Sequence, residues 1–413
     1  MTFSGDHLEE RSNWSKTRSR ITISAIIVVL LFLTINPSTQ GPTLVGIALM
    51  ATIMFHEAGH FIAAKWSKMK ATEFFVGFGP RIWSFKRGET EYGIKAIPLG
   101  GYVKILGMTD MEESLGDEEH RSYREGKTHK KLIVILAGVT VNIFLAFILI
   151  YSVLVFRGIE VESKNQNAII GKTSPGLPAA GAGLRSGDQI LEVGGEGVKT
   201  FDDLVEKIGS YQVGDKVQIK YLRDGKTKST SLTTQRRPDP KTGKPTNKPY
   251  IGIVPMVDYE KSGPVEAVGQ TFTALYNTVD ISIGSMTSRF SASGLNEYSG
   301  IVANGEYERQ DRPSSVAGIV NLGGQAVDQD IWDLLRLMAV INIFLALFNL
   351  LPILPLDGGH AAIAVYEWVA SKIMKRRIKA NHKKLIPIAT AFIGFVLLLS
   401  LSTLWLDILQ IAS

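Results

Sequence analysis

Long uninterrupted apolar runs constrain this chain more than any other feature of its sequence. A helix needs roughly 20 apolar residues to cross about 30 Å of hydrocarbon. Runs of about that length predict membrane helices at residues 42–66, 132–156, 332–358 and 385–408. Backbone groups in lipid must be hydrogen-bonded within their own segment, which favours helices over open strands. We therefore expect a polytopic α-helical membrane protein.

A fifth and shorter apolar run lies in residues 21–40. Its apolar part covers 15 residues, from Ile21 to Ile35, and follows a basic tail at residues 1–20. This length would suit the core of a signal peptide, but the following NPSTQG lacks the small-x-small pattern of a cleavage site. We favour a first membrane helix that is retained.

The distribution of lysine and arginine predicts the orientation in the membrane. Basic residues gather in the tail 1–20, in residues 67–131 and in the loop 372–384. Placing all three in the cytoplasm satisfies the positive-inside rule with five crossings, and residues 157–331 are then extracytoplasmic. The net charge of +6 is explained by this arrangement, so we expect the lipid bilayer of the cell membrane, and no nucleic acid, as a partner.

The cytoplasmic segment 67–131 is not a plain loop. Residues 73–107 contain short aromatic and β-branched runs separated by glycine-rich turns, which predicts β-hairpins. The apolar residues of these hairpins favour a β region associated with the membrane, with a small β-subdomain packed on itself as the alternative. Residues 110–125 are highly charged, and we expect them to be exposed.

The extracytoplasmic part contains a compact α/β module at residues 165–256. The sequence SPGLPAAGAGLRSGDQILEVGGEGV within it resembles the core signature of PDZ domains, a family that binds peptide ends by adding a strand to a sheet. A polar loop is expected at 236–249. The predicted strands are Ala168–Ile170, Gln189–Val193, Lys216–Leu222 and Ser229–Thr233, around a helix near Phe201–Gly209.

Residues 263–331 are expected to form an amphipathic helix and a long connector. Apolar residues between Pro264 and Met286 recur in steps of three and four, which predicts one apolar stripe on a helix. Such a helix can pack on the PDZ-like module or lie on the membrane surface, and we favour packing.

The run at residues 42–66 contains the sequence HEAGH, from His56 to His60. Ionisable groups are costly within a membrane segment, so they usually mark function. Residues four apart lie on one face of a helix, where two imidazoles can bind one zinc ion. Glu57 is then placed to act as a general base toward water at the metal. The alternative is a paired polar network inside the helix bundle.

A catalytic zinc needs a third protein ligand and an open position. The chain has no cysteine, which excludes thiolate ligands and disulfides, so this ligand must be a histidine or a carboxylate. In NLLPILPLDGGH, from Asn349 to His360, two prolines and a glycine pair predict irregular backbone lining a polar cavity. Asp357 and His360 are both candidates, although a capped helix end with an exposed Asp357 would also fit.

These motifs together resemble the site-2 protease family of intramembrane zinc metalloproteases. The resemblance covers about residues 42–408 and is carried by HEAGH, by GFGP with ETEYGIKAIPLGGYVKILG, by the PDZ-like module and by NLLPILPLDGGH. The order of motifs is similar to that of the bacterial branch whose members cleave anti-sigma factors. The sequences FFVGFGP and RGETEYG resemble actinobacterial members.

The resemblance implies roles for particular residues. By their match to the family motifs, His56, His60 and Asp357 would bind Zn²⁺, and Glu57 would be the base. Asp357 is therefore preferred over His360.

Two asparagines are implied to bind the substrate. Asn349 matches the family pattern NxxPxxxLDG, whose asparagine is thought to hold the substrate backbone. Asn142 falls where the family has AGPxxN, although Val139 replaces the proline here.

The expected function is that of an endopeptidase acting on single-pass membrane proteins, such as an anti-sigma factor already trimmed by an upstream protease. An inactive adaptor that binds peptide ends through the PDZ-like module is a competing hypothesis, and the intact Glu57 argues against it. A metal transporter is a third hypothesis, but the membrane runs contain few of the acids that an ion pathway would need.

Overall fold

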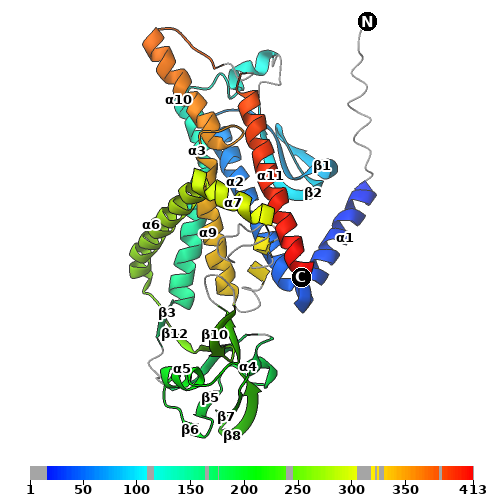
Figure 1. The fold of residues 1–413 in the computed structure, drawn as a ribbon. Helices are drawn as coiled ribbons and strands as arrows, with labels where there is room; N and C mark the ends of the chain where they lie inside the picture. Colours follow the sequence, from blue (N-terminus) through cyan, green and yellow to red (C-terminus); the bar gives the residue numbers. More distant parts are fainter. Residues whose placement is uncertain are drawn as a thin grey trace. The chain divides into compact units, whose positions relative to one another are not determined.

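The computed structural model describes residues 16–108, 116–162, 167–174, 176–238, 245–304, 318–320, 323–324, 330–380 and 384–412. The chain divides into two compact units, whose elements are labelled in Figure 1. The first unit comprises the described residues of 1–153, 267–293 and 314–413, and the second those of 154–266 and 294–313.

The first unit is a helix bundle with one sheet. Helix α6 lies mostly in this unit, and α7 lies mostly in the second. The helices outside the PDZ-like module are α1 (Lys16–Ile35), α2 (Pro37–Trp66), the 3₁₀ helix η2 (Gly116–Arg121), α3 (Thr128–Ser152) with the π-helical turn η3 (Val153–Arg157), α6 (Pro264–Arg289), α7 (Ala292–Asn304), α9 (Ile331–Asn349), α10 (Asp357–Met374) and α11 (Ile386–Ala412).

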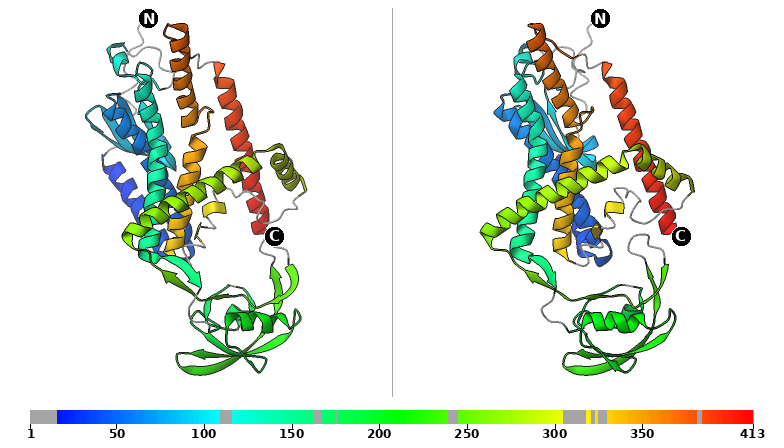
Figure 2. Two further views of the ribbon diagram at one scale, coloured as in Figure 1. Left: turned by 90° about the vertical axis from the view of Figure 1, so that its left-hand side faces the viewer. Right: turned by 60° about the vertical axis from the view of Figure 1, so that its left-hand side comes forward.

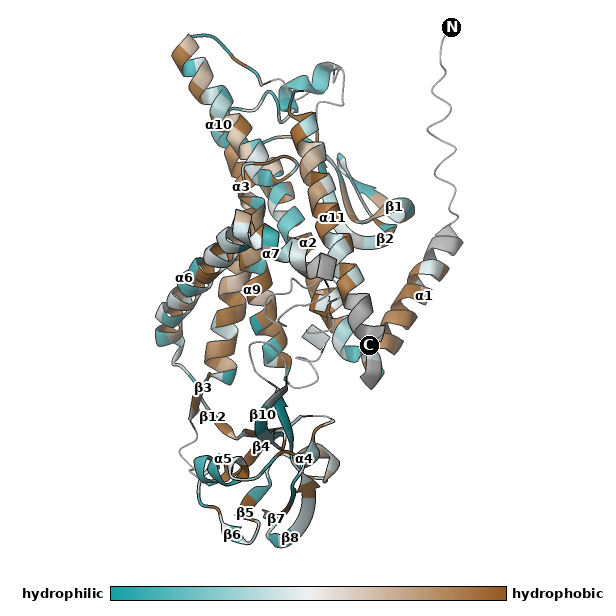
Figure 3. Cartoon of the chain, in the orientation of Figure 1, coloured by the Kyte–Doolittle hydropathy of each residue, from teal (hydrophilic) through white to brown (hydrophobic). Residues whose placement is uncertain are grey.

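Within the described residues, four helical stretches are long and apolar enough to cross a membrane. They are Thr39–Trp66, Thr128–Arg157, Ile331–Asn349 and Ile386–Leu406, and Ile21–Ile35 is a shorter apolar helix. Hydrophobic colour dominates α3 and α9 (Figure 3). The chain is thus a multi-pass membrane protein, as predicted, while the crossing by α1 and the orientation stay predictions.

Helices α2, α3 and α9 form the centre of the bundle and lie side by side in both views of Figure 2. Val45 of α2 packs against Leu334 and Met338 of α9. Buried Asn342 of α9 donates a hydrogen bond of 3.2 Å to the hydroxyl of Thr52 in α2. Apolar packing and a buried polar contact therefore hold these helices together.

Helix α6 packs on the bundle rather than on the PDZ-like module, so the packing partner favoured from the sequence was wrong. Its buried Leu275 clusters with Ala146 of α3 and Ile343 of α9. The apolar stripe was recognised correctly, but periodicity alone does not specify which surface covers a stripe.

Strands β1 (Ala71–Arg87) and β2 (Thr90–Ile105) form the predicted β region. Residues 73–76 have partners on both sides, in 101–104 and in 91–94, and residues 81–87 pair with 90–95. The two long strands thus fold into four adjacent segments, and residues 101–105 form one edge. This edge lies against α2, where a Cβ added to Gly101 would be 2.3 Å from the Met54 sulfur.

The second unit is the PDZ-like module with its connecting ribbons. Strands β6, β5, β7 and β8 form one sheet in that order, and β3–β12, β4–β11 and β9–β10 are paired ribbons. The elements are β3 (Ile159–Glu162), β4 (Ile170–Thr173), α4 (Pro178–Gly181), β5 (Gln189–Val193), β6 (Glu196–Gly197), α5 (Phe201–Gly209), β7 (Lys216–Arg223), β8 (Lys226–Thr233), β9 (Gln235–Pro238), β10 (Pro245–Tyr250), β11 (Ile253–Pro255) and β12 (Val257–Glu260).

The predicted elements of this module agree well with the structure. Helix α5 and strand β5 have the predicted bounds, and a capping box between Thr200 and Asp203 explains why α5 begins where it does. Strand β4 starts later than the predicted strand, and β9 and β10 form a ribbon where a polar loop was expected. Residues 163–166 and 239–244 lie outside the described residues.

Three other expectations from the sequence were wrong in part. Ser122 and Tyr123 are buried, although the segment 110–125 was expected to be exposed. Helix α7 occupies part of the expected connector, of which residues 305–317 lie outside the described residues. The fourth membrane run was expected to be one helix over 332–358, but α9 ends at Asn349 and a separate α10 begins at Asp357.

The PDZ-like module contains an ion pair between a buried carboxylate and a half-buried arginine, which makes its stability depend on pH. Asp188 accepts hydrogen bonds from the Arg223 guanidinium at 2.6 Å and from the backbone N–H of Arg185 at 2.8 Å. Burial alone would raise the pKa of Asp188, but these donors outweigh it and hold the pKa below its ordinary value. The carboxylate therefore stabilises the fold above about pH 4, and this stabilisation is lost as the pH falls through the folded-state pKa.

We predict that Asp188→Asn destabilises the module near neutral pH and has a smaller effect at acidic pH below the folded-state pKa of Asp188, where position 188 is uncharged in both proteins. Hydrogen-exchange mass spectrometry of β5 and β7, corrected for the intrinsic effect of pH on exchange, measures this difference. Asp202→Asn, at an exposed position of α5, is the control. An equal loss of protection at both pH values would contradict the prediction.

Candidate metal centre

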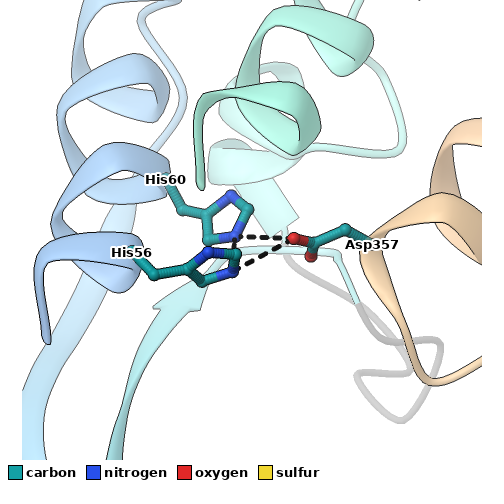
Figure 4. A group of neighbouring side chains, drawn as sticks. All are labelled: His56, His60 and Asp357. Carbon is teal, nitrogen blue, oxygen red and sulfur yellow. Dashed lines mark hydrogen bonds and ion pairs between the residues drawn. The ribbon is translucent and has the colours of Figure 1, made fainter. Parts of the chain in front are cut away.

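Two histidines of α2 form the first part of the centre. The helix continues through HEAGH, so His56 and His60 point to the same side, and both are buried. Their Nε2 atoms are 3.1 Å apart. Figure 4 shows both imidazoles directed toward one carboxylate from a distant part of the chain.

That carboxylate belongs to Asp357, the first residue of α10. Its Oδ2 lies 3.1 Å from Nε2 of His56 and 3.2 Å from Nε2 of His60. The three residues form a group of side chains that could hold a metal ion, and they come from positions about three hundred residues apart.

The backbone between α9 and α10 explains how Asp357 reaches the histidines. Residues 350–356 are not helical, and Pro352 and Pro355 interrupt this segment. A Cβ at Gly358 would lie 2.3 Å from the carbonyl oxygen of Leu350. Only glycine permits this close approach, which turns the start of α10 toward α2.

The chemistry of the three atoms fits a bound cation. Nδ1 of His60 lies 2.8 Å from the carbonyl oxygen of Val134, which can only accept a hydrogen bond. In the neutral ring Nδ1 therefore carries the proton, and Nε2 presents a lone pair. Asp357 Oδ2 is buried without a hydrogen-bond donor. Nδ1 of His56 has no hydrogen-bond partner, so Nε2 of His56 can present a lone pair as well, and three acceptors that converge in this way are stabilised by a positive charge between them.

The distances agree with zinc in particular. Zinc binds histidine nitrogen and carboxylate oxygen at about 2.0–2.2 Å with tetrahedral angles, which separates neighbouring ligand atoms by about 3.3 Å. The three observed separations of 3.1, 3.1 and 3.2 Å are close to this value. The carbonyl of Val134 supplies the outer contact that orients His60.

Glu57 lies beside this group and contacts the sheet. Its Oε2 accepts a hydrogen bond of 3.0 Å from the backbone N–H of Val103, in the edge segment of β2. The side chain is half-buried. This contact orients the carboxylate, because a backbone donor in a sheet is fixed in place.

Gly138 of α3 provides the space for the two imidazoles. A Cβ at this position would lie 2.5 Å from Nε2 of His60 and 2.7 Å from Nε2 of His56. Helix α3 thus contacts the centre with its backbone, through Val134 and Gly138, and not with ligand side chains.

The other predicted residues lie at different positions. His360 is one turn after Asp357 and lines a neighbouring cavity, and it is not part of the metal-competent group found among the described residues. Asn349 is the last residue of α9 and is half-buried. Asn142 is fully buried in α3, and its substrate-binding role stays a prediction.

Sequence reasoning missed the residues that act through their backbone. The carbonyl of Val134 and the N–H of Val103 have no signal in the sequence, because every residue but proline carries both groups. Gly138 did carry a signal, since a glycine within an apolar helical run often marks a close approach.

The chain is similar to known proteases over most of its length. The model of peptidase family M50 matches residues 44–397. Zinc metalloprotease Rip1 of Mycobacterium tuberculosis is 33% identical over 391 residues, which covers 87% of this chain and 95% of that relative. Zinc metalloprotease Rip1 of Mycolicibacterium smegmatis is 31% identical over 401 residues, covering 90% and 97%.

A likeness to a solved structure concerns a smaller part of the chain. The crystal structure of the PDZ domain of an SdrC-like protein from Listeria monocytogenes covers 23% of this chain and 93% of its own, with 26% identity and a TM-score of 0.19.

We predict that Gly138→Ala strongly reduces zinc binding, because the added methyl group displaces the imidazoles. Zinc content of the purified protein, measured by atomic emission, tests this. Gly46→Ala in α2 is the matched control, since a Cβ there meets nothing within 4 Å. Full zinc content in Gly138→Ala would show that the centre tolerates the displacement or lies elsewhere.

Proposed function

Because this chain belongs to peptidase family M50, the site-2 protease family, and is a membrane-embedded zinc metalloendopeptidase, we propose that it cleaves single-pass membrane proteins within or next to their membrane helix. A trimmed anti-sigma factor is the proposed substrate. The observation that carries this proposal is the convergence of His56, His60 and Asp357 within the helix bundle, with Glu57 beside them.

The proposed metal ligands are His56 and His60 from α2 and Asp357 from α10. Zinc bound there would supply Lewis acidity toward a scissile carbonyl and toward a water molecule. Three protein ligands leave one tetrahedral position open, as catalytic zinc sites require.

Glu57 is the proposed general base. It follows the first ligand directly in α2, and the Val103 N–H holds one of its oxygens. A carboxylate fixed in this way can accept a proton from the attacking water and return it to the leaving amine.

The edge segment 101–105 of β2 is the proposed place where substrate backbone binds. A substrate helix has its backbone hydrogen bonds closed and must unwind before hydrolysis. A sheet edge can hold an extended peptide by adding it as a strand, and residues 102–104 of this edge keep part of their surface accessible although the edge lies against α2. The contact between Val103 and Glu57 supports this assignment, because it brings the edge next to the base. Asn349 is proposed as a further contact to substrate backbone.

The proposed topology places the N-terminus and the β1–β2 sheet on the cytoplasmic side and the PDZ-like module outside. In this arrangement the module would exclude substrates with bulky outer domains until another protease trims them. The basic residues around α1, β1–β2 and the end of α10 support this orientation.

We predict that Glu57→Gln retains zinc and that its cleavage rate falls by at least about 100-fold, the usual scale of general-base catalysis. Cells that express this variant beside a candidate single-pass substrate should accumulate the trimmed form, detected by immunoblotting. Glu260→Gln, at an exposed position of the second unit, should cleave normally. Unchanged cleavage by Glu57→Gln would dismiss Glu57 as the base.

The third ligand is tested by comparing two substitutions in α10. We predict that Asp357→Ala lowers zinc content well below about one ion per chain, because two histidines alone do not complete the site. His360→Ala should retain its zinc. Normal zinc content in Asp357→Ala together with loss in His360→Ala would transfer the role to His360.

A further inference from the structure

Helix α3 presents one buried stripe to the rest of the bundle, and the stripe begins with a charged residue. Two of its members serve the metal centre, Val134 through its carbonyl and Gly138 through the space it leaves. The first member, Lys131, has only 8% of its surface exposed. The complete stripe is Lys131, Val134, Ile135, Gly138, Val139, Asn142 and Ala146.

Lys131 forms an ion pair with α10, the helix that carries Asp357. Its Nζ lies 2.9 Å from Oε2 of Glu367, and both side chains are largely buried. The other carboxylate oxygen of Glu367 accepts the backbone N–H of Ala380 at 3.0 Å. The ammonium group also lies 5.5 Å from the centre of the Tyr123 ring. A buried charge is costly unless it is paired, so neither partner is readily separated from the other.

The spacing along the helices relates this ion pair to the metal centre. Glu367 follows Asp357 by ten residues, which is about 15 Å along α10. Lys131 precedes Gly138 by seven residues, about 10 Å along α3, and the long lysine side chain covers the remaining distance. Helix α10 is thus held at two points, by Asp357 at the metal centre and by Glu367 at Lys131.

Between these two points α10 is packed only in part, since Ala364 is buried while a cavity lies beside it. Ala361 packs against the core formed by α2 and α3 near Asp357. Beyond it lies a cavity of about 350 Å³, whose lining includes Tyr123, Lys131, His360, Ile363, Ala364 and Glu367. Interdigitating side chains normally set the register of packed helices, and the cavity leaves part of this stretch without them.

We propose that Lys131 and Glu367 are positioning residues, whose ion pair sets the register of α10 against α3 and thereby holds Asp357 within coordinating distance of the two histidines. The inference rests on the proposed role of Asp357 as a metal ligand. Neither residue contacts the metal or the substrate. Their effect on the centre passes through the rigid first turns of α10.

The affinity for zinc separates this role from a purely structural one. The test uses purified full-length chain in lipid nanodiscs, with the zinc dissociation constant measured by competition with a chromophoric chelator. The melting temperature of the zinc-free chain is measured beside it. Glu367→Gln and Lys131→Met should each weaken zinc binding by about 10-fold, the lower end of the range seen when groups that contact metal ligands directly are changed. Lys131→Arg, which keeps the charge, should bind zinc nearly as well as the wild type.

The reversed pair Lys131→Glu with Glu367→Lys should recover most of the affinity lost in the single variants. Glu125→Gln is the control, because Glu125 pairs with Arg377 and Lys379 and links the residues just before α3 to those just after α10 at a more exposed position. Its dissociation constant should stay within about twofold of the wild type, since exposed ion pairs contribute little.

Wild-type affinity in Glu367→Gln, with or without a lower melting temperature, would overturn the positioning role and leave only a structural one. Wild-type affinity in His56→Ala would have a different meaning. It would show that His56 does not bind the zinc ion, and it would therefore overturn both the proposed function and this inference. A third outcome separates the two. If the wild type binds zinc tightly, His56→Ala loses this affinity and Glu367→Gln keeps it, the proposed function stands and only the positioning role is overturned.

Discussion

The convergence of three hydrogen-bond acceptors inside an apolar helix bundle is the interaction on which the rest of this structure depends. Two imidazole nitrogens and a carboxylate oxygen lie 3.1–3.2 Å apart, a separation that is unfavourable for three unprotonated acceptors in a medium of low polarity without a cation between them. The two helices that meet here have unusual local features for this reason. Helix α2 contains ionisable residues in a membrane segment, and the backbone before α10 turns so closely that it requires Gly358.

Helix α3 acts as the scaffold of the centre although it contributes no proposed ligand. Successive turns of one buried face provide the carbonyl of Val134, the space at Gly138 and the charge of Lys131. A membrane bundle gains little from the hydrophobic effect between its helices, so close approach and buried polar contacts carry much of its specificity. The same contacts that hold the bundle together therefore also orient the metal-binding side chains.

The sequence was sufficient to predict the membrane runs, the PDZ-like module and the residues that meet at the centre, because helical periodicity, turn residues and the HEAGH spacing are local signals. The preference for Asp357 over His360 came from the family resemblance, since both follow the same irregular segment. Contacts between distant positions could not be predicted in this way. Lys131 and Glu367 are 236 positions apart, and no local pattern indicates that two such charges will pair. The prediction of which surface covers the apolar stripe of α6 was wrong for the same reason.

The position of Glu57 connects the metal centre to the sheet. The N–H of Val103 is satisfied by the Glu57 carboxylate, so this donor at the edge of β2 is already in use. A peptide that pairs with residues 101–105 would therefore compete with Glu57 for the same N–H, or would have to pair around it. A buried donor or acceptor that loses its partner is costly, so binding at the edge and the position of the carboxylate are energetically coupled. In this geometry a substrate strand that takes the Val103 N–H releases the carboxylate that we propose as the base.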